Sequence, residues 1–177
     1  MAKNSRKQIE KDRIKIIKEL LQNSNKSINE IAKTCGFSRQ KVWRIIKDLE
    51  KNQTIWGYTA VIDEEKLERK SYIALIKRTN EPIKKQVLDS IINREMEEKG
   101  KKIDISIKGS MYTNGVYDWV ICFEGNNIKD AKKFTESLTK EFKGFIKEID
   151  LLDKMFLIKK SGIENPNANK LREQFDL

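Results

Sequence analysis

One stretch of the sequence, Ser38 to Lys47, carries polar and basic side chains at spacings that place them on one face of a helix. We predict this helix over residues 39–51, because its apolar residues recur every three or four positions and give one buried face: Val42, Ile45, Ile46 and Leu49. The opposite face holds the candidate binding residues Ser38, Arg39, Gln40, Lys41, Trp43, Arg44 and Lys47. Such a helix fits the major groove of DNA, where Arg pairs with guanine and Gln with adenine. The pattern therefore predicts double-stranded DNA as a partner.

These candidates have different expected roles. The two arginines and the glutamine would read bases, whereas the two lysines would bind phosphates without reading sequence. Ser38 and the free amides of the first helical turn suit a phosphate. Trp43 has two interpretations, since its ring could stack on the sugar-phosphate backbone or pack on the domain beside a wing, and the second is commoner for an aromatic residue at helical spacing.

A second, shorter helix precedes this one at the distance expected for a helix-turn-helix. Ser27 and Glu30 have the spacing of a capping box, which predicts a helix that starts after Ser27. Gly36 stops that helix, because glycine suits a left-handed C-terminal position. Phe37 then anchors the turn, and Ser38 caps the next helix.

The flanking segments complete a winged helix-turn-helix over residues 1–63. Residues 9–24 show the apolar spacing of an amphipathic helix, and residues 1–8 are predicted to be a basic arm that is mobile or lies against phosphate. Residues 55–63 are rich in aromatic and β-branched residues, with Gly57 at a turn, so we predict the strands of the wing there.

Charge and composition narrow the function further. The chain of 177 residues has a formal net charge of +10, and residues 1–60 hold 14 basic and 6 acidic residues, so the excess lies mainly in the N-terminal third. There is no histidine, and the two cysteines, Cys35 and Cys122, are far apart, so we predict no metal site, no cofactor and no enzymatic activity. No apolar run reaches the ~18 residues of a membrane span and no secretory signal is present, so the expected location is cytoplasmic.

The remaining sequence predicts a second domain of mixed α and β structure. After a linker at residues 64–70, strands are expected at 72–79, 103–108 and 116–123, helices from Pro82 to about Lys99 and at 127–143, and a last strand or pair of strands at 145–159. This order gives the ferredoxin-like βαββαβ pattern over residues 71–160. One face of its sheet would be left open, and a second copy of the chain is the natural cover. Residues 161–177 are predicted to be a polar tail with a short helix near residues 171–175, and we assign no function to this tail.

The order of these parts resembles the leucine-responsive/AsnC (Lrp/AsnC, feast/famine) family of prokaryotic transcription regulators. The resemblance rests on residues 12–17, 28–33, Gly36-Phe37-Ser38, residues 42–44 and 55–63, and on Gly115-Val-Tyr-Asp-Trp119 in the second domain. It implies a homodimer, or a higher homo-oligomer, that regulates transcription and binds amino acids at a subunit interface. Gly115, Tyr117 and Asp118 map onto the edge of that effector site. From the residues alone, Gly115 could equally serve the turn and Asp118 could cap it.

Some positions depart from the family pattern. Gln53 stands where the family usually has Gly before the wing, so Asn52 is expected to make the turn. Ile45 stands where an Arg is common, which removes one phosphate contact. The helix from Pro82 is longer than usual, and residues 109–113 are unusual.

Two other functions compete with transcription regulation. The same two-domain plan is similar to that of sirohaem decarboxylases, which keep a vestigial DNA-binding head, but the missing histidine and the basic helix argue against them. The other alternative is an interaction module that pairs only through its sheets, and an acidic helix face would favour it.

Overall fold

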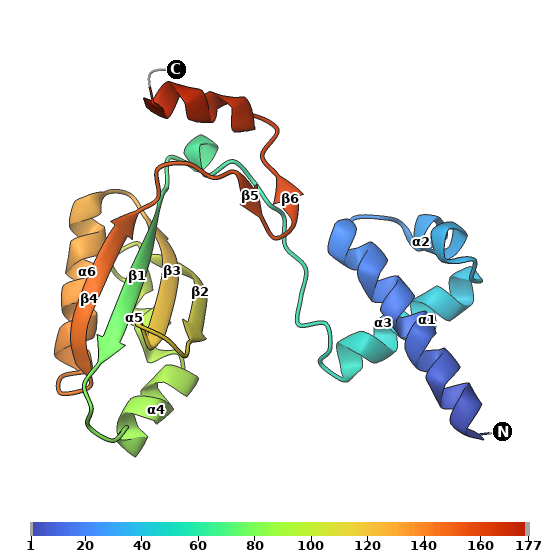
Figure 1. The fold of residues 1–177 in the computed structure, drawn as a ribbon, viewed down its shortest axis with the longest axis horizontal. Helices are drawn as coiled ribbons and strands as arrows, with labels where there is room; N and C mark the ends of the chain where they lie inside the picture. The colour runs from blue at the N-terminus through green and yellow to red at the C-terminus, as the bar shows by residue number, and fades with distance from the viewer. Residues whose placement is uncertain (1, 176–177) are drawn as a thin grey trace. The chain divides into compact units, whose positions relative to one another are not determined.

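The chain divides into two compact units. The computed structural model describes residues 2–175, apart from the side chains of residues 2–5 and 65. The first unit comprises the chain up to Val61 together with the segment from Ile158, and the second runs from Ile62 to Leu157 (Figure 1). Each unit has its own hydrophobic core.

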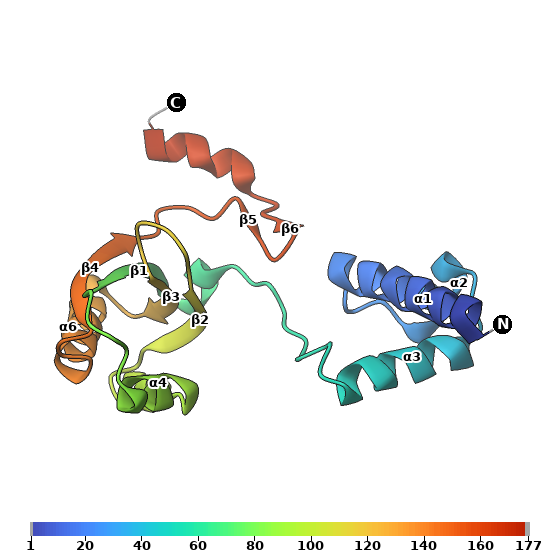
Figure 2. The same ribbon diagram turned by 60° about the horizontal axis from the view of Figure 1, so that its bottom comes forward.

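Three helices build the core of the first unit: α1 (Ala2–Gln22), α2 (Ile28–Cys35) and α3 (Arg39–Lys51) (Figure 2). Buried side chains from all three helices meet there: Ile16, Ile31, Ala32, Cys35, Val42, Ile45, Ile46 and Leu49. The predicted buried face of α3 is therefore confirmed.

Local signals fix the ends of α2 and the start of α3 as predicted. The Ser27 hydroxyl accepts the backbone N–H of Glu30, and the Glu30 carboxylate accepts that of Ser27, which completes the capping box. Gly36 takes a left-handed conformation with φ of 70°. The Phe37 backbone N–H then donates to the Ala32 carbonyl over 2.9 Å, which ends α2 and begins the turn.

Two parts of the first unit differ from what the sequence suggests. α1 begins at Ala2, so the described part of residues 1–8 is helical and not mobile, while the alternative that these residues lie against phosphate stays a prediction. Its Lys, Arg and Gln residues favour helix, and no Gly or Pro interrupts the turns before Ile9. The wing strands predicted at residues 55–63 are also absent, because the described backbone from Asn52 to Arg69 contains no strand. Trp56 in this stretch is 96% exposed, and a strand without a hydrogen-bonded partner is not stable by composition alone.

The turn after α3 is made by Gln53 rather than by Asn52. Gln53 has φ of 61°, whereas Asn52 has φ of −89°. The Asn52 side chain instead accepts the backbone N–H and the hydroxyl of Thr54, at 3.1 and 2.7 Å. A residue with a Cβ therefore occupies the left-handed position that glycine would occupy at lower cost.

The second unit is a four-stranded antiparallel sheet with helices on one face. Its strands are β1 (Lys70–Arg78), β2 (Ser106–Tyr112), β3 (Trp119–Gly125) and β4 (Ile146–Asp153), in the order β2-β3-β1-β4. The helices α4 (Lys85–Ile92), α5 (Glu95–Lys101) and α6 (Ile128–Glu141) connect them, and the short 3-10 helix η1 (Glu64–Leu67) precedes β1. The βαββαβ order confirms the predicted α+β, ferredoxin-like fold.

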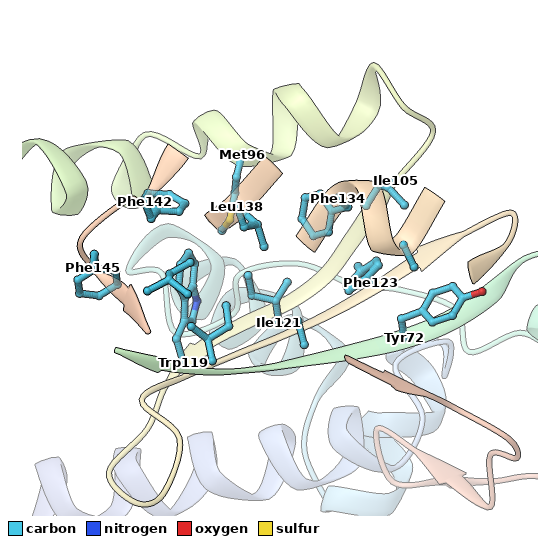
Figure 3. Close-up of a cluster of buried hydrophobic side chains, with 14 residues drawn as sticks. Tyr72, Met96, Ile105, Trp119, Ile121, Phe123, Phe134, Leu138, Phe142 and Phe145 are labelled. Atoms are coloured by element: carbon cyan, nitrogen blue, oxygen red, sulfur yellow. The ribbon is translucent and has the colours of Figure 1, made fainter. Parts of the chain in front are cut away.

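Aromatic side chains fill the space between this sheet and its helices (Figure 3). Trp119 is 1% exposed, and its ring packs edge-on against Phe142 with centroids 5.5 Å apart. Its indole N–H donates to the Ser110 hydroxyl over 2.9 Å, so the buried polar atom of the ring is satisfied. Phe123 packs against Phe134 of α6 with centroids 4.8 Å apart.

The single helix predicted from Pro82 to about Lys99 is two helices in the structure. Arg94 takes a left-handed conformation with φ of 60° between α4 and α5. In one continuous helix, Met96 would point away from Val87 and Ile91, which pack on the core. The break turns Met96 inward, where it is 3% exposed.

The strand predicted at residues 103–108 begins later and ends later, as β2. Asp104 has φ of 57°, which interrupts the extended chain, and Ile105 is buried in the core before the strand begins. The strand predicted at 116–123 is β3, which also starts later, because residues 113–118 form the connecting loop. The helix predicted at 127–143 is α6, with Asn127 as its N-cap.

The chain ends with three short elements. β5 (Lys159–Lys160) and β6 (Ile163–Glu164) pair in an antiparallel hairpin, and the 3-10 helix η2 (Ala168–Phe175) follows. The predicted short helix near residues 171–175 is thus part of a longer helical segment, and residues 176–177 lie outside the described residues.

Candidate nucleic-acid interface

The outward face of α3 carries three long polar side chains that are free to bind a partner. Arg39, Gln40 and Arg44 are exposed. Among the described residues, none of the three makes a side-chain hydrogen bond or an ion pair. Ser38 caps the helix, and its hydroxyl accepts the Lys41 backbone N–H over 3.2 Å. The first turn of α3 therefore presents the Arg39 guanidinium and the Gln40 side-chain amide beside its own backbone N–H groups.

Lys41 points toward α1 rather than away from the unit. Its Nζ lies 2.6 Å from Asp12 Oδ2 and 4.1 Å from the centre of the Phe37 ring. The hydrogen bond from Lys41 is the largest influence on Asp12 and lowers the pKa of its carboxyl group, and a second hydrogen bond from Gln8 acts in the same direction. Lys41 thus holds α3 against α1, a role that the sequence prediction of a phosphate contact did not include.

A second ion pair joins the same two helices. The Arg13 guanidinium binds the Asp48 carboxylate in α3, and it also lies 3.8 Å from Glu10. The partners are 35 positions apart in the sequence, so no local pattern could have identified them. Together the Asp12–Lys41 and Arg13–Asp48 pairs fix how α3 crosses α1.

The later turns of α3 have a mixed surface. Lys47 Nζ lies 2.7 Å from Glu50, and the Tyr58 hydroxyl donates to the same carboxylate over 3.1 Å. These hydrogen bonds, led by the one from Lys47, lower the pKa of Glu50. Trp43 is 51% exposed, so half of its ring surface remains accessible on this helix.

Ile45 lies in the core of the first unit and is 8% exposed. Its position therefore offers no side chain to a phosphate.

The predicted effector segment lies in the loop between β2 and β3. Asp118 is held by the protein itself: its Oδ2 accepts the Arg78 backbone N–H over 2.9 Å, and its own N–H donates to the Ile76 carbonyl. The Tyr117 hydroxyl donates to Asp150 over 2.9 Å, which raises the pKa of that tyrosine. Nothing lies within 4 Å of a Cβ built on Gly115, so this glycine is open to solvent rather than packed. These two hydrogen bonds join Asp118, at the end of the loop, to the backbone of β1.

The face of the sheet opposite the helices is partly apolar, and no other described element of the second unit covers it. The register places two rows across it: Gly109, Cys122, Ile73 and Leu152, and then Met111, Val120, Leu75 and Asp150. Met111 and Leu152 are 49% and 45% exposed. At one end of this face, Lys77 Nζ lies 3.0 Å from Glu148 and 5.1 Å from the centre of the Tyr117 ring.

Two kinds of site do not occur in the part of the chain that the structure describes. None of its helices is long and apolar enough to cross a bilayer. Among the side chains that the structure describes, there is also no cluster of three or more Cys, Asp or Glu placed to bind a metal ion.

Comparison with known proteins agrees with this arrangement. A family model described as winged helix-turn-helix DNA-binding matches residues 12–55. The chain is 28% identical over 120 residues to YugG of Bacillus subtilis (strain 168), an uncharacterized HTH-type transcriptional regulator, and the match covers 67% of this chain and 69% of YugG.

Solved structures of transcription regulators share the fold of both units. An AsnC family transcriptional regulator from Agrobacterium tumefaciens matches 88% of this chain and 96% of its own, with a TM-score of 0.61 and 18% identity. The regulator NMB0573 from Neisseria meningitidis, solved in complex with L-Met, matches 85% of this chain and 92% of its own, with a TM-score of 0.60 and 16% identity.

Proposed function

We propose that this chain, which belongs to the Lrp/AsnC family of winged helix-turn-helix transcription regulators, recognises specific DNA sequences through the outward face of α3. It is a DNA-binding regulator and not an enzyme, so the decarboxylase alternative is set aside. The observation that carries the proposal is the freedom of Arg39, Gln40 and Arg44 on the first turns of α3. These residue types form two hydrogen bonds with guanine or adenine in the major groove.

The remaining candidate residues either contact the DNA backbone or hold α3 in place on α1. Ser38 and the amides of the first turn suit a phosphate at the edge of the groove. Lys47 is exposed and would contact the backbone after leaving Glu50. Lys41 acts mainly by fixing α3 on α1, and Trp43 would stack against the sugar-phosphate backbone.

The experiment is a measurement of Kd for the wild type and two variants on duplexes from the region upstream of the gene. We expect Arg44→Ala to weaken specific binding by about 1–3 kcal/mol and to relax base preference at one position. Lys132→Ala, which removes an exposed cation from α6, is the control and should bind as the wild type does. Equal affinity of wild type and Arg44→Ala for specific DNA would contradict base reading by α3.

We further propose that the chain binds DNA as a homodimer paired through the open face of the sheet. Half-buried Ile73, Leu75 and Val120 lie at the centre of this face, and exposed Met111 and Leu152 lie beside them. Burial of such a patch stabilises association by about 25 cal/mol for each Å² of apolar surface. A two-fold pair would present two α3 helices to half-sites about 34 Å apart, or a multiple of that distance.

An amino-acid effector is the third part of the proposal, supported by the L-Met complex of the Neisseria relative. Gly115, Tyr117 and Asp118 would lie at the rim of its site. Nothing packs against Gly115. Asp118 Oδ1 lies 3.8 Å from Arg78 Nε, so this oxygen can still accept a hydrogen bond from an ammonium group. Thermal unfolding with a panel of amino acids tests the idea. A ligand that raises Tm for the wild type and not for Tyr117→Phe would support it, and no shift with any amino acid would contradict it.

A further inference from the structure

Four lysines form a row along α1 that the proposed α3 contacts do not use. Lys7, Lys11, Lys15 and Lys18 are all exposed, and we call them the α1 lysine row. Their spacings of four, four and three residues place them on one side of the helix. At 1.5 Å per residue the row is about 16 Å long. It lies away from Ile16, which faces the core and is fully buried.

The acidic residues of α1 are already bound to other cations. Glu10 lies 3.8 Å from Arg13, and Asp12 lies 2.6 Å from Lys41. Glu19 lies 2.7 Å from Lys26. Among the described side chains, no carboxylate forms an ion pair with a member of the α1 lysine row.

The row is continuous with the turn that leads into α3. Lys15 Nζ lies 5.6 Å from the centre of the Phe37 ring, and Lys41 lies over the same ring. Phe37 directly precedes the N-cap Ser38. Cations from α1 and α3 therefore meet beside the first turn of α3.

The amino-terminal turns of α1 project past α3. Asp12 and Arg13 contact α3, while Ile16 and Leu20 pack in the core, so the turns before Asp12 continue on the side away from that core (Figure 1). Arg6, Lys7 and Lys11 lie on these projecting turns.

The segment predicted to form the wing supplies no cation on its side of α3. Residues 52–63 contain neither Lys nor Arg. The hydroxyl of Tyr58 in this segment is bound to Glu50. This segment therefore offers no positively charged side chain to DNA phosphates beside α3.

We infer that the α1 lysine row binds the phosphate backbone of the DNA strand next to the groove that α3 enters. This inference rests on the proposed function of α3 and adds a second contact surface to it. Phosphates give one negative charge per ~1.7 Å of duplex axis, so a 16 Å row of cations about 6 Å apart spans several of them. Such contacts raise affinity for any sequence and position α3 without reading bases.

The test compares two variants of equal charge change. In the first, Lys7, Lys11, Lys15 and Lys18 are all replaced by Gln. In the control, four exposed lysines of α6 and the following turn are replaced by Gln: Lys129, Lys132, Lys140 and Lys143. Thermal unfolding establishes that both fold. Kd is then measured from 50 to 300 mM salt on a specific duplex and on a scrambled duplex.

We expect the row variant to bind both duplexes more weakly and to keep the base preference of the wild type. The slope of log Kd against log salt concentration should fall by about 0.9 for each lost phosphate contact, or about 3 to 4 for each first unit that binds DNA. The control variant should keep the wild-type slope. A wild-type slope in the row variant would overturn the inference while leaving base reading by α3 intact. A wild type that binds neither duplex would overturn the proposed function and this inference with it.

A vesicle measurement separates DNA from an anionic membrane as the partner of the row. Vesicles of phosphatidylserine and phosphatidylcholine are mixed with the wild type and the row variant. Binding that depends on the row, combined with an unchanged DNA salt slope, would overturn the inference in favour of a membrane surface. Absence of vesicle binding by the wild type supports DNA.

Discussion

Lys41 Nζ lies 2.6 Å from Asp12 Oδ2, and this contact links the first turn of α3 to α1. Asp12 is 5% exposed, so its carboxylate depends on Lys41 and Gln8 for hydrogen bonds. The position of the first turn of α3, which carries Arg39 and Gln40, therefore depends on an ion pair with α1.

The Asp12–Lys41 pair predicts how stability depends on pH. The pKa of Asp12 is lowered in the folded protein, so its contribution is present above the unfolded pKa of about 3.9 and is lost as pH falls through the folded pKa. We expect the urea midpoint of the wild type to fall as pH is lowered from about 5 toward 2, and the Asp12→Asn variant to lose part of this dependence. Asp89→Asn, at an exposed position of α4, is the control. Identical pH profiles for wild type and Asp12→Asn would contradict the role of the pair.

Gly36 is predicted to be required for its backbone conformation and not for space. Its φ is 70°, and nothing lies within 4 Å of a Cβ built there. Gly36→Ala should therefore lower the free energy of unfolding by about 1–2 kcal/mol through strain alone. Gly57 has the same open surroundings without the positive φ, so Gly57→Ala should change stability by less than about 0.5 kcal/mol. Equal effects in urea unfolding would refute this explanation.

Replacement of Gln53 by Gly should stabilise the protein. Gln53 has φ of 61°, a conformation that costs a residue with a Cβ about 1–2 kcal/mol, and glycine would remove this strain. Glycine also makes the unfolded chain more flexible, which offsets part of the stabilisation. We expect a net increase of about 0.5–1 kcal/mol in the free energy of unfolding. Asn52→Gly provides the comparison, because it removes the hydrogen bonds to Thr54 at a negative φ and should destabilise. A loss of stability in Gln53→Gly would show that the glutamine side chain contributes more than its backbone strain costs.

The open face of the sheet predicts a variant that separates the proposed dimer. Leu75 lies in the middle of the face and is opposed by Val120 and Asp150. Leu75→Glu should place a carboxylate in the pairing surface and shift the mass in sedimentation experiments toward the monomer. DNA affinity should fall by 10²–10⁴-fold, since two linked heads bind with a high effective concentration. Thr139→Glu, on the exposed side of α6, should leave both quantities unchanged, and a Leu75→Glu protein of wild-type mass would argue against pairing through this face.

The helix-turn-helix could be predicted from the sequence because its determinants are local. Ser27, Glu30, Gly36 and Ser38 act within a few residues of themselves, and each occupies the capping or turn position that its type predicts. The βαββαβ order was also predictable, because strand and helix spacings alternate clearly between residues 71 and 160.

The errors arose where distant contacts decide the structure. The helix from Pro82 breaks at Arg94 because Met96 must reach a core built by β3 and α6. The composition of residues 55–63 favours a strand, yet no strand lies beside this segment in the described part of the chain. The partner of Lys41, Asp12, lies 29 positions earlier, so no local pattern indicates this ion pair. The α1 lysine row is visible in the sequence as a spacing, but its closeness to Phe37 is known only from the fold.

The three tryptophans occupy three different environments. Trp119 is buried in the sheet domain, Trp43 is half exposed on the recognition helix, and Trp56 is almost fully exposed in the segment between them. Indole emission shifts to longer wavelength in water, so the unlabelled protein carries separate optical reporters of sheet folding and of events at α3. Variants that keep only Trp43 or only Trp119 would follow DNA docking and domain unfolding independently, without any attached dye.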